Sequence, residues 1–195
     1  RLPNGSVFPT LILAMLACLI LGMGLPTSAA YIVAGTVVAP VLLKLNILPL
    51  TAHFFVFYFA IISVVTPPVA VASYAAAGMA GANPTRVGWM AMSLGVVAFI
   101  VPYMFINTPG LLFQDVLWRV ALNFCTALVG VFCLGIAIQG YWKAPASPII
   151  RIICLAASLL FIDGGWVTDL MGVVLFVAVY WIQNMKRKKL AAEKG

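Results

Sequence analysis

Apolar residues follow one another through most of this chain, in long runs that are separated only by short polar segments. The runs lie at 9–22, 27–43, 51–80, 87–107, 116–140, 148–162 and 166–184. A helix needs about 20 apolar residues to cross the ~30 Å hydrocarbon core of a bilayer. Only 8% of the residues are charged, whereas about 25% is usual in soluble domains. The sequence therefore predicts an all-α integral membrane protein without a soluble domain.

The net charge of +7 does not indicate a nucleic-acid-binding protein. The basic residues form no groove-sized patch with interleaved aromatic residues, and their one cluster, MKRKK at 185–189, directly follows the last apolar run. Cysteines lie inside apolar runs without C-x-x-C spacing, which indicates small hydrophobic side chains rather than a metal or redox site. They are Cys18, Cys125, Cys133 and Cys154.

The distribution of charge predicts the orientation. If residues 9–43 enter and leave on one side, the later runs alternate across the membrane, and eight basic residues fall on one side against three on the other. Since positive residues collect on the cytoplasmic side, the C-terminus is expected in the cytoplasm. The expected cytoplasmic residues are the MKRKK cluster, Arg86, Lys143, Arg151 and Lys194, and the expected outer ones are Arg1, Lys44, Arg119 and the turn at Asp163.

The stretch GMGLPTSAAYIVAG at 22–35 interrupts the first long run with Gly22, Gly24 and Pro26. Residues 9–43 are too few for two full crossings and a turn. Their length suits a re-entrant hairpin that turns partway through the membrane. Unpaired backbone groups at that depth cost several kcal/mol each unless protein or a water-filled cavity surrounds them.

A second interruption, SVVTPPVAVASYAAAG at 63–78, lies in the run 51–80. Pro67 and Pro68 have no N–H to donate and clash with the preceding turn of a helix. Pro67 also disfavours helical geometry at Thr66. Residues 51–80 are therefore predicted to form two half-helices joined by an unwound middle.

The two breaks together predict a binding site. Carbonyl groups at the ends of half-helices and the hydroxyls of Ser63 and Thr66 are hard oxygen ligands that suit a small cation. The helices that begin near Thr27 and Val69 present N–H groups and positive dipole ends to an anion. Each break alone also has an ordinary explanation, a proline kink or an interhelical loop. Both breaks close together favour a secondary transporter.

Residues 1–112 resemble the C-terminal repeat of the large membrane subunit of tripartite ATP-independent periplasmic (TRAP) transporters. The motif G-M-x-L-P at 22–26 and the T-P-P break at 66–68 carry the resemblance. The nearest likeness is to the fused 4TM/12TM permease of the TAXI type. Residues 113–195 resemble its additional C-terminal transmembrane helices, which end in a basic cytoplasmic tail.

This resemblance implies an elevator-type, sodium-coupled importer of small organic anions such as dicarboxylates or acidic amino acids, in a bacterial or archaeal inner membrane. Residues 1–112 would be the C-terminal inverted repeat, with hairpin 9–43, broken helix 51–80 and helix 87–107. The implied partners are a TAXI-type periplasmic substrate-binding protein, an N-terminal remainder of the permease and the lipid bilayer. Sodium would be the coupling ion, with no other cofactor.

The resemblance also implies roles for residues at the two breaks. The ion-binding residues would be Gly22, Met23, Gly24, Ser63, Thr66 and Pro67. The substrate-binding residues would be Pro26, Thr27, Ser28, Pro68 and Val69.

Two alternatives remain at this stage. One is a membrane scaffold or assembly subunit that does not transport, and the other is an intramembrane enzyme, which the lack of a catalytic dyad disfavours. Asp163 and Asp169 in FIDGGWVTD are interpreted as belonging to a surface loop rather than to a carboxylate catalyst. His53 and the tryptophans are interpreted as residues of the membrane interface.

Overall fold

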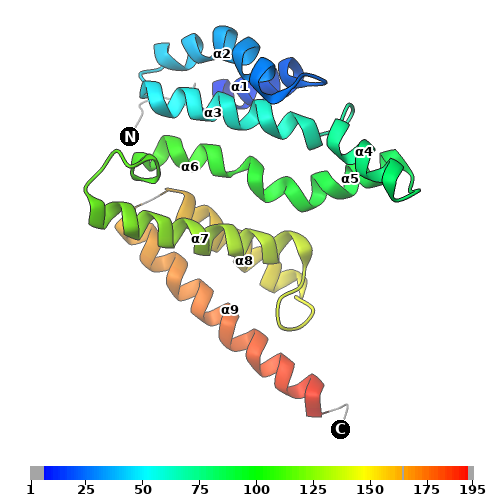
Figure 1. Cartoon of the computed structure of the whole chain (residues 1–195). Helices are drawn as coiled ribbons and strands as arrows, with labels where there is room; N and C mark the ends of the chain where they lie inside the picture. The colour runs from blue at the N-terminus through cyan, green and yellow to red at the C-terminus, as the bar shows by residue number, and fades with distance from the viewer. Residues whose placement is uncertain (1–6, 164, 193–195) are drawn as a thin grey trace. The chain divides into compact units, whose positions relative to one another are not determined.

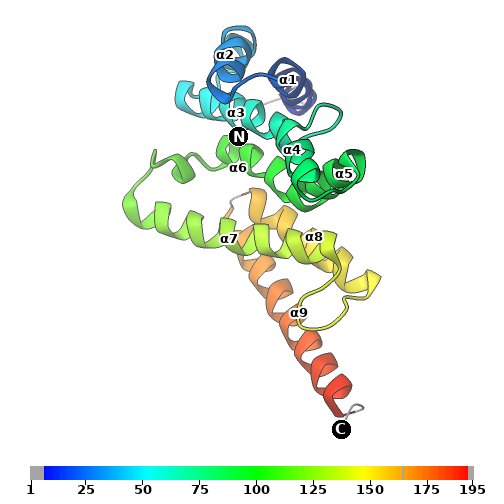
Figure 2. The ribbon, with the colours of Figure 1, turned by 45° about the vertical axis from the view of Figure 1, so that its right-hand side comes forward.

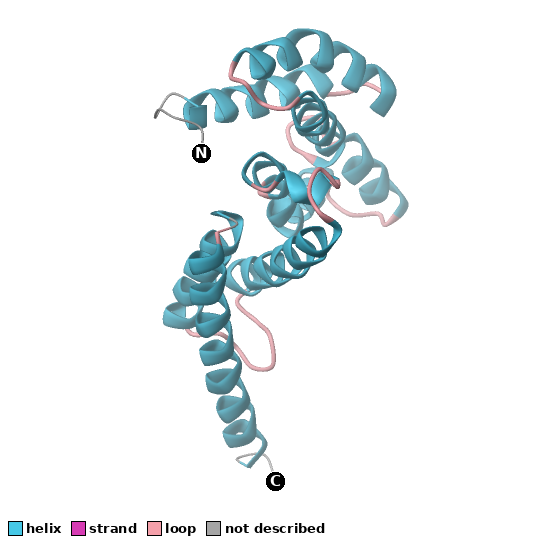
Figure 3. Ribbon diagram, turned by 90° about the vertical axis from the view of Figure 1, so that its left-hand side faces the viewer, coloured by secondary structure: helices cyan, strands magenta, loops and turns pink. Residues whose placement is uncertain are grey.

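The computed structural model of the chain describes residues 7–163 and 165–192, and the regular elements in them are helices (Figures 1 and 3). Four described helical segments are long and apolar enough to cross a membrane. They are Thr27–Lys44, Pro84–Asn107, Leu117–Gln139 and Trp166–Arg187. The predicted class, an all-α integral membrane protein, is confirmed.

The chain divides into two compact units, one reaching to Ile106 and the other starting at Asn107. The division falls a few residues before the predicted boundary at 112, because the short turn η3 (Pro109–Leu112) packs on the helix that follows it. The units are described separately below.

Helices α1 (Val7–Gly22), α2 (Thr27–Lys44) and α3 (Pro49–Ile62) pack side by side in the first unit (Figure 2). Ala30 and Ala34 of α2 are fully buried, and such small side chains let helices approach closely in a membrane. The hydroxyl of Tyr31 on α2 also lies 3.0 Å from Nδ1 of His53 on α3. These three helices fix the position of the turn between α1 and α2.

Aromatic rings extend this core toward α6 (Val101–Asn107). Phe55 and Phe59 of α3 are fully buried, and the ring of Tyr103 on α6 packs edge-on against both of them. The Tyr103 hydroxyl also donates a hydrogen bond to the sulfur of Met15 on α1. Helix α6 is thereby tied to both α1 and α3.

The predicted broken helix 51–80 appears as α3, the 3-10 turn η1 (Ser63–Val65) and α4 (Val71–Met79). The predicted helix 87–107 is also interrupted. Helix α5 (Pro84–Gly95) begins earlier than expected, since the side chain of Asn83 accepts the backbone N–H of Arg86 and caps it. The turn η2 (Val96–Phe99) then separates α5 from α6.

Three helices form most of the second unit, namely α7 (Leu117–Gln139), α8 (Pro148–Asp163) and α9 (Trp166–Ala192). Helix α8 runs back between the other two, so α7 and α9 begin at the same end of the unit (Figure 1). Helix α9 continues through the basic cluster instead of ending at 184, because lysine and arginine are good helix formers.

Phe161 of α8 is buried between two glycines of the neighbouring helices. A Cβ atom at Gly130 of α7 would lie 2.9 Å from the Phe161 Cβ, and one at Gly172 of α9 would lie 2.8 Å from the ring. Both distances are shorter than real carbon contacts. The two glycines therefore allow the three helices to close on one phenylalanine.

We expect Gly130→Ala to lower the free energy of unfolding by about 1–3 kcal/mol, the usual cost of overpacking a core. Gly135→Ala on the same helix is the matched control, since a Cβ there would meet nothing within 4 Å, and it should be neutral or stabilising because alanine favours a helix over glycine. Denaturant unfolding in detergent measures both. Equal effects of the two substitutions would contradict this packing.

Candidate functional site

The turn between α1 and α2 is the first predicted break, and it is a tight reversal of the chain. The N–H of Leu25 donates to the carbonyl of Gly22, and Gly24 has a left-handed φ of +76°, which favours glycine. Pro26 caps α2 without a side-chain hydrogen bond to its first turn. The first N–H groups of α2 belong to the exposed residues Thr27 and Ser28 and have no carbonyl partner within the helix.

The second break follows η1. Thr66 has an extended backbone, the Pro67–Pro68 peptide is cis, and Ala70 has a left-handed φ of +33°. Helical geometry resumes at Val71, two residues later than the predicted start at Val69, because the left-handed Ala70 cannot belong to the helix. The unwound segment between the half-helices is therefore 66–70.

The hydroxyls of Ser63 and Thr66 are buried and oriented at this break. The Ser63 Oγ donates to the carbonyl of Ala60 at 2.6 Å, and the Thr66 Oγ1 donates to the carbonyl of Ile62 at 2.8 Å. A hydroxyl that donates its one proton still has two lone pairs. Each hydroxyl proton points at its carbonyl partner. The lone pairs of the hydroxyl oxygen therefore point away from that carbonyl and can accept a cation.

The two breaks meet at Gly22 and Ser63. A Cβ atom added to Gly22 would lie 2.6 Å from the Ser63 Oγ and 2.9 Å from the carbonyl oxygen of Ala60. On the other side of the turn, a Cβ at Gly24 would lie 3.7 Å from a methyl group of Val69. The hairpin turn thus lies against the break, with Gly22 as its point of tightest contact.

The ends that meet are both C-terminal. Gly22 is the last residue of α1, and Ser63 follows the last residue of α3. The C-terminal end of a helix carries roughly −0.5 of an elementary charge from its unpaired carbonyl groups. Two such ends around two buried hydroxyls create a negative potential without any carboxylate, which suits a monovalent cation.

Among the described residues, no three His, Cys, Asp or Glu side chains group to hold a metal ion. A transition-metal site would draw its ligands from such side chains. The oxygen atoms at the two breaks are instead neutral hydroxyls and carbonyls.

The predicted residues fall into two groups. Gly22, Ser63 and Thr66 lie at or beside the contact between the breaks, and Gly24 and Val69 lie at its edge. Met23, Pro26, Thr27 and Ser28 belong to the turn and the start of α2, while Pro67 and Pro68 belong to the unwound segment.

Two residues that support the break are not apparent from the sequence. The hydroxyl of Tyr74 on α4 donates to the carbonyl of Pro68 at 2.7 Å. A Cβ at Gly88 of α5 would lie 3.0 Å from the Tyr74 ring and 3.6 Å from Pro67. These contacts hold the unwound segment between α4 and α5. A tyrosine one turn into α4 is the only sequence signal for them.

Comparison with protein families gives a match to a family model described as the tripartite ATP-independent periplasmic transporter, DctM component. It covers residues 2–138 of the 195 in the chain and so includes both breaks. Neither the curated proteins nor the solved structures give a match.

Proposed function

Since the chain belongs to the DctM component family of tripartite ATP-independent periplasmic transporters, we propose that it is the C-terminal part of a sodium-coupled secondary transporter. In this proposal it imports small organic anions that a periplasmic binding protein of the TAXI type delivers. The observation that carries the proposal is the contact between Gly22 and Ser63, where the ends of two helices meet around oriented hydroxyls.

The coupling ion is proposed to bind where these ends meet. The Ser63 and Thr66 oxygens supply hydroxyl ligands, and carbonyls of the turn at Gly22, Met23 and Gly24 and of the segment before Pro67 supply the rest. Hard, neutral oxygens suit sodium, and the helix ends add negative potential. The bound ion would hold the hairpin turn against the break.

The substrate is proposed to bind at the starts of α2 and α4, which begin at Thr27 and Val71. Each start has N–H groups without helical partners and a positive dipole end. Thr27 and Ser28 are exposed, and their neighbours Pro26, Pro68 and Val69 would shape the site. A dicarboxylate or acidic amino acid has the negative charge that such a site favours.

The remaining parts of the proposal concern the whole transporter. An N-terminal part of the permease would supply the inverted repeat and the other half of the substrate site, and the two repeats would work by an elevator movement. The hairpin would be re-entrant, in an inner membrane with the basic end of α9 in the cytoplasm. Helix α1 has only 16 residues, which fits a segment that stops partway. Helix α2 is long enough to cross a membrane, but in this proposal it turns back with α1.

The test is uptake into proteoliposomes that contain the complete permease, with its periplasmic binding protein supplied outside. Radiolabelled succinate, 2-oxoglutarate and glutamate serve as probes, with an inward gradient of sodium, potassium or protons. We expect uptake of at least one probe with sodium and little with potassium. Uptake driven by protons alone would contradict sodium coupling. If none of the gradients drives uptake and sodium does not raise the thermal stability of the permease, the scaffold alternative is favoured.

A further inference from the structure

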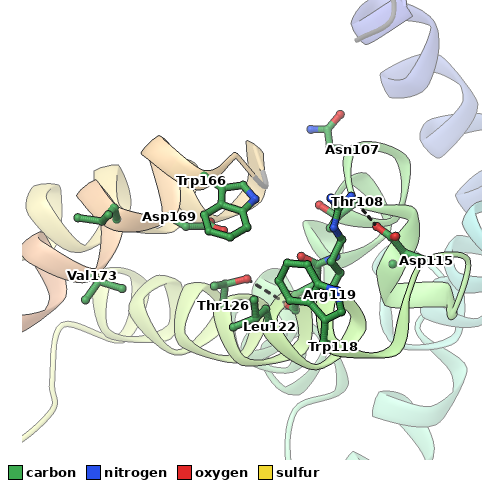
Figure 4. A pocket seen from close by; sticks show the side chains of 13 residues that line it. Asn107, Thr108, Asp115, Trp118, Arg119, Leu122, Thr126, Trp166, Asp169 and Val173 are labelled. Carbon is green, nitrogen blue, oxygen red and sulfur yellow. Dashed lines mark hydrogen bonds and ion pairs between the residues drawn. The ribbon is translucent and has the colours of Figure 1, made fainter.

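A cavity of about 480 Å³ lies within the second unit. It is bounded by the turn η3 and by the first turns of α7 and α9 (Figure 4). At the η3 side the packing is tight, since a Cβ at Gly110 would overlap the amide of Asn123 on α7. The proposed transport site uses none of the residues that line this cavity.

Charges of both signs face the cavity from different helices. Arg119 of α7 has its guanidinium 5.4 Å from the centre of the Trp118 ring and 3.9 Å from a carboxylate oxygen of Asp115. Asp169 lies in the first turn of α9 and lines the cavity from the other side. The two carboxylates offer a partner for a positive group, and the guanidinium of Arg119 offers one for a negative group. A ligand that carries both charges matches the cavity best.

The lining becomes apolar along the helices. Arg119, Asp169 and the two tryptophans, Trp118 and Trp166, lie in the first turns of α7 and α9. The two tryptophan rings pack edge-on at 6.1 Å. Leu122 lies one turn further along α7, and Leu170 and Val173 lie further along α9. Both helices are long enough to span a membrane. Tryptophans mark the interface of a bilayer, so the apolar residues lie toward its hydrocarbon core.

We infer that this cavity binds the headgroup of a zwitterionic phospholipid with a primary ammonium group, such as phosphatidylethanolamine. The phosphate contacts the Arg119 guanidinium, which has five N–H donors and retains several beside Asp115. The ammonium donates to the Asp169 carboxylate. A choline headgroup has no N–H to donate to this carboxylate. An acyl chain lies along Leu122, Leu170 and Val173.

Native mass spectrometry of the detergent-purified protein tests this inference. Phosphatidylethanolamine, phosphatidylcholine and phosphatidylglycerol with identical acyl chains are titrated separately. We expect phosphatidylethanolamine to bind roughly tenfold more tightly than phosphatidylcholine, the effect of one charge-assisted hydrogen bond. Asp169→Asn should abolish this preference, and Asp169→Glu should restore most of it. Arg119→Gln should weaken all three phospholipids by a similar factor.

Arg86→Gln is the control, because this arginine is exposed and lies in the other unit. It should leave the three affinities unchanged. Thermal unfolding of each variant without added lipid shows that it is folded, and Arg119→Gln tests the site independently if Asp169→Asn does not fold. Equal affinity of the wild type for phosphatidylethanolamine and phosphatidylcholine would overturn the inference. Competition by glycerophosphoethanolamine, the headgroup without acyl chains, at the same concentration as the lipid would also overturn it. The cavity would then bind a soluble ligand.

Discussion

Replacing Gly22 with alanine should reduce sodium-dependent uptake to about a fifth or less, as expected from overpacking that costs roughly 1–3 kcal/mol at the ion site. The added Cβ would lie 2.6 Å from the Ser63 Oγ and 2.9 Å from the Ala60 carbonyl oxygen. The carbonyl belongs to the backbone of α3 and cannot rotate away. The end of α1 must therefore move off the break, which separates the proposed sodium ligands.

The matched control is Gly78→Ala on α4, where a Cβ would meet nothing within 4 Å. Initial uptake rates and the sodium concentration at half-saturation are measured for both variants in proteoliposomes with the binding protein supplied. Gly22→Ala should raise the half-saturation concentration, and Gly78→Ala should not. Thermal unfolding without sodium separates a damaged site from a damaged fold. If Gly22→Ala transported with wild-type sodium dependence, the ion would not bind at this contact.

Gly24 is constrained differently from Gly22. Its Cβ position is 3.7 Å from Val69, an ordinary contact, but its φ of +76° is one that other residues rarely adopt. The steric limit to the approach of the two breaks therefore lies at Gly22, and the limit at Gly24 is set by the backbone.

The positions of both breaks could be predicted because glycine and proline act on the backbone locally. Pro67 and Pro68 interrupt a helix wherever they occur within it, and the Gly24 turn depends on neighbouring residues alone. The left-handed Ala70 could not be predicted, since alanine does not favour that geometry. It is held by packing from Gly88 and Tyr74, which come from other turns of the chain.

The cavity of the second unit likewise depends on contacts between distant residues, which the sequence does not predict. The sequence supports the interpretation of Asp163 and Asp169 as members of one surface loop, because they lie near each other in FIDGGWVTD. In the fold, Asp169 shares a cavity with Arg119 of another helix. The two residues line the same cavity because α8 returns the chain to the start of α7. No local sequence pattern predicts this arrangement.

Thr66→Val should weaken sodium binding with little change in shape, because valine replaces the hydroxyl with a methyl group. Thr66 is 5% exposed, and its Oγ1 donates to the Ile62 carbonyl at 2.8 Å. The substitution removes one proposed sodium ligand. We expect the half-saturation concentration for sodium to rise roughly tenfold, as for the loss of one hydrogen bond or ligand worth about 1.4 kcal/mol. Thr66→Ser keeps the hydroxyl and should retain most of the affinity.

Thr36→Val controls for the loss of a hydroxyl that bonds to its own helix, since the Thr36 Oγ1 donates to the Val33 carbonyl at 2.9 Å on the exposed side of α2. Its sodium dependence should be that of the wild type.

Thr66→Val should also weaken substrate binding at low sodium, because linkage requires each ligand to raise the affinity of the other by the same factor, typically about 5–150-fold. At saturating sodium the substrate affinity should recover. A substrate affinity that stayed low at every sodium concentration would place Thr66 in the substrate site, and unchanged sodium half-saturation would remove its hydroxyl from the ion site.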